Sequence, residues 1–306
     1  MNALQRHRQR ARVRQRKIGQ APGTAIYVGE PSTLGVGARE IRYDRTFAAE
    51  AELDLSHIEE ADYERWIDVA GIHQDRVVNA LTEAFGVHPL WVEDILNPSG
   101  RPRYDRLGNQ RFFLLRLPHE QIVVISGPRW VLSFREQPTE LWDSLRQRLL
   151  DDGRIRRMGA DFLLHALVDE VVDRSLVAVS QLRERLFVFE KALPAGERDR
   201  GARWLTLRDE VADWSRVARA TQTAVATILT AEHRLADPVR PFFADLADHA
   251  LQFAEDADSV LCRVDAVWRR LLVDEAQRAR RSMRMLGIAG AFGLLLVVSL
   301  CAWLAG

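Results

Sequence analysis

The chain of 306 residues contains very little cysteine. Its two cysteines, Cys262 and Cys301, lie far apart, so they can form neither a disulfide framework nor the ligand spacing of a zinc site. The sequence also contains no glycine-rich phosphate loop, no nucleophile triad and no His-Glu metalloprotease spacing. These absences argue against an enzyme, and the cysteine usage fits a reducing compartment for the soluble part of the chain.

The sequence has no net charge, because 43 basic residues balance 43 acidic ones. The charges are unevenly distributed, since residues 1–24 carry six arginines, one lysine, no acidic residue and few large apolar side chains. We interpret them as a basic, disordered tail, with a patch for anionic lipid headgroups as the alternative. The tail lacks interleaved aromatic residues, so we expect no nucleic-acid partner, and no apolar run follows it as a secretory signal would require.

Residues 25–155 mix strand and helix signals and are expected to form an α/β domain. Short apolar runs split by turn residues predict a strand meander over 111–117, 121–125 and 130–134. Helical spacing predicts a helix over 75–85, and Pro89 suits the first turn of a second helix over 89–96.

Residues 156–284 have helical periodicity and are expected to form a stalk of long helices. After Pro241 the chain contains no proline, and the predicted helix over 242–305 would be roughly 95 Å long. Apolar residues recur along it in steps of three and four, as in a heptad seam that packs against the chain's own earlier helices or against copies of itself. The seam consists of Phe243, Leu246, Ala250, Phe253, Ala257, Val260, Val264, Val267 and Leu271.

Residues 285–306 are predicted to form a transmembrane helix, since an uncharged apolar run of about 20 residues can cross a bilayer. Arg278, Arg280, Arg281 and Arg284 precede this run, and positive flanks stay in the cytoplasm. The sequence therefore predicts a protein of the inner (plasma) membrane whose N-terminal body is cytoplasmic. A single span encloses no pore, so a transport function would need several copies of the chain.

Several segments, in order along the chain, resemble the CorA family of divalent-cation transporters. Trp66 precedes DVAGI, and residues 85–97 read FGVHPLWVEDILN, which is similar to the family signature FGLHPLVLEDILN. Residues 101–103 read RPR where the family has RPK. The runs WVLSFRE at 130–136 and RRMGADFLL at 156–164 resemble a family strand and the start of the first long helix.

The resemblance implies an α+β cytoplasmic domain, with a mixed sheet and flanking helices, followed by long helices and a C-terminal transmembrane helix. It also implies a homopentamer in the membrane that passes magnesium, with cobalt as a second cargo, without ATP. By resemblance, Asp94 and Asp245 would hold a regulatory divalent ion between neighbouring protomers, with Glu93 as a weaker ligand. Met283, Leu286 and Leu294 would line the pore as an apolar gate.

The sequence departs from the family pattern where a Gly-Met-Asn loop and a second span are expected. It contains no Gly-Met-Asn, and Trp303-Leu304-Ala305-Gly306 stands where the loop should fall. The alternative function is therefore a membrane-anchored sensor or scaffold that keeps the family body without conducting. On this ground we expect the 306 residues alone to conduct magnesium poorly.

Overall fold

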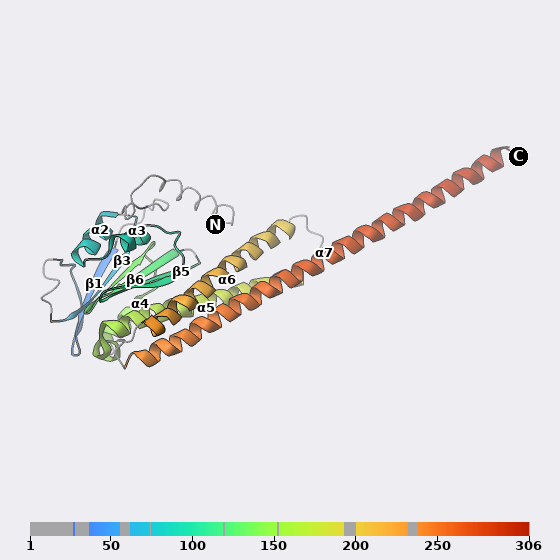
Figure 1. The fold of residues 1–306 in the computed structure, drawn as a ribbon. Coiled ribbons are helices and arrows are strands. Elements are labelled where there is room, and N and C mark those ends of the chain that lie inside the picture. Colours follow the sequence, from blue (N-terminus) through green and yellow to red (C-terminus); the bar gives the residue numbers. More distant parts are fainter. Residues whose placement is uncertain are drawn as a thin grey trace.

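The computed structural model describes Tyr27 and residues 37–55, 62–73, 75–118, 120–151, 153–192, 200–231 and 238–305. The predicted basic tail, residues 1–24, lies outside the described residues. A sheet with flanking helices forms one end of the molecule, and three long helices extend from it (Figure 1). The strands are β1 (Gly37–Tyr43), β2 (Ala48–Ala51), β3 (Glu64–Ala70), β4 (Arg103–Leu107), β5 (Gln110–Leu117), β6 (Glu120–Ser126) and β7 (Trp130–Arg135). The helices are α2 (Asp75–Ala84), α3 (Pro89–Ile95), α4 (Asp143–Asp151), α5 (Gly153–Ala192), α6 (Arg200–Ala231) and α7 (Arg240–Ala305).

The seven strands form one mixed sheet in the order β2-β1-β3-β7-β6-β5-β4. Neighbouring strands are antiparallel except β3 and β7, which are parallel, with Asp68 opposite Ser133. The chain between β3 and β7 contains α2, α3 and the β4–β6 meander, which is the long connection that a parallel pair requires.

Successive apolar side chains of the central strands point to opposite faces of the sheet, so each face contributes to a separate core. Phe112 and Leu114 of β5 pack with α2 and α3 on one face. Phe113 and Leu115 pack on the other face with α4, α5 and the sheet-proximal parts of α6 and α7. The sheet is thus covered by helices on both faces, which explains its near-continuous apolar strands.

The long helices pack along the seam predicted from the sequence. Phe253, Ala257, Val260 and Val264 of α7 are buried against α5 and α6. The seam therefore packs against the chain's own earlier helices, one of the two partners that its pattern allowed. A change of direction at Gly159, where φ is +78°, divides α5 into a short first segment and a long second one.

Several predicted elements are confirmed, and others had no clear signal. The meander corresponds to β5, β6 and β7, the two short helices correspond to α2 and α3, and the long unbroken helix is α7. Strands β1 to β4 and helix α4 were not predicted. Within the described residues, no helix is long and apolar enough to cross a membrane.

Candidate metal centre

A group of potential metal ligands lies where α5 and α7 pack side by side. Asp169 and Asp173 are one turn apart on α5, so both project from the same side of that helix. His249 of α7 faces them, and its Nδ1 lies 3.7 Å from Oδ1 of Asp169. One potential ligand atom from each of the three residues lies within 4.8 Å of the others. These three side chains are called the α5–α7 cluster below.

The α5–α7 cluster is partly shielded from water, and this changes the protonation of its acids. Burial raises the pKa of Asp169, and the nearby carboxylates Asp245 and Glu170 add to the rise. Burial also raises the pKa of Asp173, and the charge of Asp169 acts in the same direction. Because like charges crowd this site, a bound cation would relieve their repulsion and favour the ionised carboxylates.

Asp245, a ligand predicted from the sequence, lies beside the α5–α7 cluster. It is exposed on α7, one helical turn before His249. Its charge is among the causes that raise the pKa values of Asp169 and Asp173. Asp245 therefore lies near the candidate cluster without belonging to it, and its role as a ligand stays a prediction.

His165 holds the beginning of α7 against α5 next to this cluster. Its Nε2 lies 3.0 Å from the carbonyl oxygen of Phe242, and its ring packs against Phe162 and Phe243. A carbonyl only accepts hydrogen bonds, so Nε2 carries the proton of the neutral ring. Burial lowers the pKa of His165 to about 4, which keeps the ring neutral near pH 7. His165 therefore positions the two helices without adding charge to the site.

The ligand set suits a divalent cation. Carboxylate oxygens are the ligands that magnesium prefers, and magnesium usually keeps several of its waters when few carboxylates bind it. Imidazole nitrogen is better suited to a transition metal such as cobalt. Two carboxylates and one imidazole with room for water fit either ion.

Asp94 and Glu93, the other predicted ligands, lie on a different side of the sheet. Both are half-buried on α3, which packs on the face opposite α5 and α7 (Figure 1). The carboxylate of Asp94 pairs with Arg103, and its backbone carbonyl accepts a 2.8 Å hydrogen bond from Gln121 Nε2. One protomer thus does not bring Asp94 and Asp245 together. Their predicted shared site requires a second copy of the chain and stays a prediction.

The predicted pore residues lie in the distal part of α7. Met283 is exposed, with 67% of its surface accessible. The side chains of Leu286 and Leu294 lie outside those that the structure describes. The pore role of the three residues stays a prediction.

Sequence reasoning missed the α5–α7 cluster. The predicted ligands were Asp94, Asp245 and Glu93, and none of the three cluster residues was among them. A signal was present, because Asp169 and Asp173 are four residues apart, as are Asp245 and His249. Two such pairs on helices that pack together can converge, but the helix register that joins them is a property of the folded chain.

Comparison with known proteins agrees with the observed fold. The chain matches the family of CorA-like Mg2+ transporter proteins over residues 62–294. It belongs to the CorA family. The members of this family transport magnesium and cobalt and are not enzymes. Membership therefore agrees with the absence of catalytic motifs from the sequence.

Individual relatives cover most of the chain. The cobalt/magnesium transport protein CorA of Thermotoga maritima is 28% identical over 295 residues, which are 89% of this chain and 82% of that protein. The full-length CmaX structure aligns with a TM-score of 0.70 at 18% identity, covering 87% of this chain and 85% of its own. The CorA magnesium transporter of Methanocaldococcus jannaschii aligns with a TM-score of 0.67 at 17% identity, covering 83% of this chain and 82% of that structure. At such identities the two structures show a shared fold.

Proposed function

We propose that this CorA-family chain is a subunit of a passive divalent-cation channel that is gated by cytoplasmic divalent ions. Magnesium is the proposed main cargo, and cobalt is the second. The observation that carries the proposal is the α5–α7 cluster, where two carboxylates and an imidazole face one another beside the helix that leads to the C-terminal end. The Thermotoga maritima relative is named for cobalt and magnesium transport, which supports this choice of ions.

The proposal places several copies of the chain around a common axis. We propose a homopentamer in the inner (plasma) membrane, with residues 285–306 in the bilayer and the N-terminal body in the cytoplasm. Met283, Leu286 and Leu294 would form the apolar constriction, which can close a pore by dewetting. Asp94 of one protomer would approach Asp245 of its neighbour, with Glu93 close by.

Ion binding would regulate the channel through electrostatics. When cytoplasmic magnesium is plentiful, a bound ion balances the carboxylates at the α5–α7 cluster and at the proposed interface between protomers. When magnesium is scarce, the ion leaves and the like charges repel one another. The closed arrangement then loses stability relative to the open one, so the ion acts by shifting the population of states.

The first test measures stabilisation of the full chain by magnesium and by cobalt. A ligand that binds the folded protein at about 100 times its Kd stabilises it by about 2.7 kcal/mol, which a thermal unfolding experiment detects easily. The double variant Asp169→Asn, Asp173→Asn should lose most of this gain, whereas the exposed α5 variant Glu184→Gln should keep it. Asp94→Ala combined with Asp245→Ala should reduce the gain if the shared site between protomers exists.

Transport is measured on the same proteins in proteoliposomes that contain a magnesium indicator. A conducting chain should take up magnesium, internal magnesium should slow this uptake, and the Asp169/Asp173 variant should resist the inhibition, whereas the missing Gly-Met-Asn predicts that uptake is poor. Metal stabilisation without uptake would favour the membrane-anchored sensor over the channel. An unchanged metal response in the Asp169/Asp173 variant would show that these acids are ordinary surface groups.

A further inference from the structure

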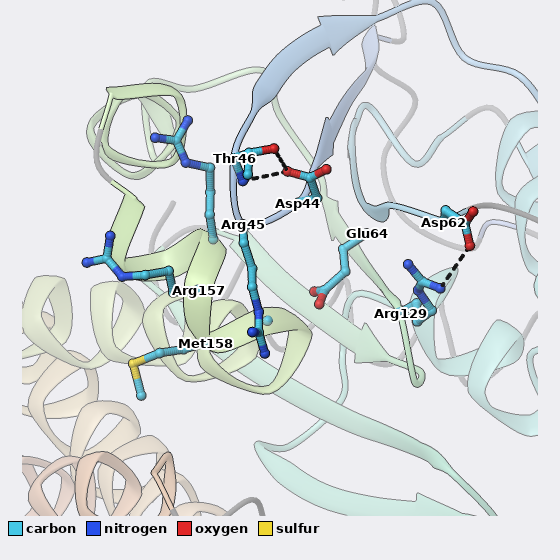
Figure 2. Close-up of a pocket in the computed structure, with 10 residues that line it drawn as sticks. Asp44, Arg45, Thr46, Asp62, Glu64, Arg129, Arg157 and Met158 are labelled. Atoms are coloured by element: carbon cyan, nitrogen blue, oxygen red, sulfur yellow. Dashed lines mark hydrogen bonds and ion pairs between the residues drawn. The ribbon is translucent and has the colours of Figure 1, made fainter.

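A pocket unrelated to the α5–α7 cluster lies where the sheet meets the beginning of α5. Its volume is about 440 Å³, which is within the range of small-molecule sites. The β1–β2 turn, the start of β3, the β6–β7 turn and the first residues of α5 form its walls (Figure 2). Four separate segments thus converge on one cavity, which is called the arginine pocket below.

Arginines dominate the lining of the arginine pocket. Arg45, Arg129, Arg156 and Arg157 all line it. Within the described part of the chain, Arg45 and Arg157 have no ion pair, and Nε of Arg156 is buried without a hydrogen-bond partner. Among the described residues, Arg129 forms one long ion pair, 4.0 Å from Nη1 to Oδ1 of Asp62, and both side chains are exposed. The pocket therefore presents guanidinium groups with unused donors.

Two of the three acidic residues in the lining do little to neutralise these arginines. The Asp44 carboxylate accepts hydrogen bonds from the Thr46 backbone and hydroxyl and from the Phe47 backbone, so it serves the β1–β2 turn. These hydrogen bonds lower the pKa of Asp44. Asp62 projects fully into solvent, where water screens its charge.

Glu64 is the remaining acid, and its position suggests a ligand. Figure 2 shows its carboxyl group between Arg45 and Arg129. Its Oε2 is buried and has no hydrogen-bond partner in the described structure. Burial raises the pKa of Glu64 and the nearby charge of Asp161 adds to the rise, whereas the Tyr43 hydroxyl and the Ala160 backbone act in the opposite direction. The carboxyl group is thus only partly satisfied inside the protein, and a hydrogen-bond donor on a bound molecule would stabilise it further.

Gly159 allows the close approach that closes the pocket floor. Its φ of +78° is accessible to glycine at no steric cost, and the turn brings α5 against Glu64. A Cβ at this position would lie 2.8 Å from Oε1 of Glu64. The space next to Glu64 is thus kept open by backbone conformation rather than filled by a side chain.

We propose that the arginine pocket binds a phosphate-bearing small molecule, with Arg45 and Arg129 contacting the phosphate and Glu64 accepting a hydrogen bond from the ligand. Guanidinium groups match phosphate oxygens in pairs and form charge-assisted hydrogen bonds. Arg156 and Arg157 add positive potential at the rim. This ligand is distinct from the proposed divalent-ion cargo, and the proposal does not depend on transport.

A soluble phosphate compound fits this pocket better than a lipid headgroup. The pocket lies at the sheet end of the molecule, and the C-terminal end of α7 lies at the opposite end (Figure 1). If residues 285–306 enter the bilayer as proposed, the length of α7 separates the pocket from the membrane surface.

The test measures binding of pyrophosphate and of ADP to the full chain by titration calorimetry in magnesium-free buffer. Arg45→Ala and Arg129→Ala should each weaken binding about tenfold or more, because each removes a charged hydrogen-bond donor. The control is Arg76→Ala. Arg76 is an exposed residue of α2, which packs on the face of the sheet opposite α5, so this variant should leave binding unchanged. Glu64→Gln should strengthen pyrophosphate binding several-fold, because it removes a negative charge beside the phosphate while the glutamine carbonyl oxygen can still accept the hydrogen bond from the ligand.

Four outcomes would overturn the proposal. The first is no measurable binding of either compound at about millimolar concentration, a range where even weak ligands register. The second is an equal loss in Arg76→Ala, which would indicate non-specific attraction. The third is weaker pyrophosphate binding by Glu64→Gln. The fourth is Arg45-dependent binding only to phosphatidylcholine vesicles that contain phosphatidylglycerol, which would identify a lipid headgroup instead. The strengthened binding expected of Glu64→Gln cannot arise from misfolding.

Discussion

The sheet end and the helical arm of this molecule place their charges in opposite ways. The sheet end buries an ionic network, in which Asp68 accepts hydrogen bonds from Arg135 and Arg146 at 2.9 Å and 3.2 Å, with at most 6% of any of these side chains exposed. The arm formed by α5, α6 and α7 has an apolar interior and carries its ion pairs on the surface. Arg263 of the arm, for example, is 52% exposed where it pairs with Glu190.

The difference shows what each region requires of its charges. A buried charge is tolerated only when all its partners are present, so the sheet network specifies how β3, β7 and α4 fit together. A surface ion pair is screened by water and holds two long side chains in place, so it contributes little to stability. The arm therefore depends on its apolar seam, whereas the sheet end combines its two apolar cores with a few buried polar contacts.

The largest expected effect is loss of the sheet network. Asp68→Ala would leave the guanidinium groups of Arg135 and Arg146 buried without their carboxylate, and Ser133 would lose its 2.8 Å hydrogen bond to Asp68. Removing one member of a buried ionic group costs about 3–5 kcal/mol of unfolding free energy. Urea unfolding of the two proteins measures the difference. A loss comparable to that of Asp256→Ala, which removes an arm ion pair with Arg183, would contradict the comparison.

A smaller effect is expected on the pH dependence of stability, and it arises from the buried side chain of Glu120. Glu120 is 8% exposed at the start of β6, and its Oε2 lacks a hydrogen-bond partner in the described structure. Burial raises the pKa of Glu120 to about 7 from an ordinary value of 4.5. The folded state therefore holds this proton more tightly than the unfolded chain. Its contribution to stability is present at low pH and is lost as the pH rises from about 4.5 to about 7.

Glu120→Gln tests this dependence, because glutamine cannot ionise. At about pH 8 the variant should be more stable than the wild type by about 1–3 kcal/mol, and near pH 4.5 the two should be similar. Unfolding free energies measured across this pH range give the answer, with exposed Glu83→Gln of α2 as the control. A wild-type protein that gains stability through this window relative to the variant would reverse the sign and refute the assignment.

The contrast between buried charges at the sheet end and an apolar interior in the arm explains what could be predicted from the sequence. Short apolar runs separated by turn residues identified β5 to β7, and the heptad seam identified the interior of the arm, because both patterns follow directly from burying apolar side chains. Arg65, Asp68, Arg135 and Arg146 resemble surface residues in a sequence, yet the structure buries all four. Their burial depends on pairing between distant strands and helices, which leaves no local pattern.

The candidate sites follow the same rule. Asp245 was proposed as a ligand from the resemblance to the CorA family, and that role stays a prediction, whereas its neighbours Asp169 and Asp173 required the register of α5 against α7. The arginine pocket joins the β1–β2 turn to the beginning of α5, segments that are far apart in the chain. The seam shows that helices associate, but their exact alignment is decided by packing of the folded arm.

The smallest expected effect is loss of an arm ion pair. Arg263 of α7 donates two hydrogen bonds to Glu190 of α5, at 2.9 Å from Nε and 2.7 Å from Nη2. The hydrogen bond from Arg263 lowers the pKa of Glu190. Because both groups remain accessible to water, we expect a coupling free energy of only about 0.2–1 kcal/mol despite the good geometry.

A double-mutant cycle of Arg263→Met and Glu190→Gln isolates this coupling, since methionine preserves the apolar stem of the arginine. Urea unfolding of the four proteins is measured at low salt and at about 1 M salt, where the Debye length falls to about 3 Å. The coupling should shrink at high salt if the pair is a screened surface interaction. A coupling above about 2 kcal/mol that persists at high salt would place this pair with the buried network around Asp68. The arm would then depend on its charges as strongly as the sheet end does.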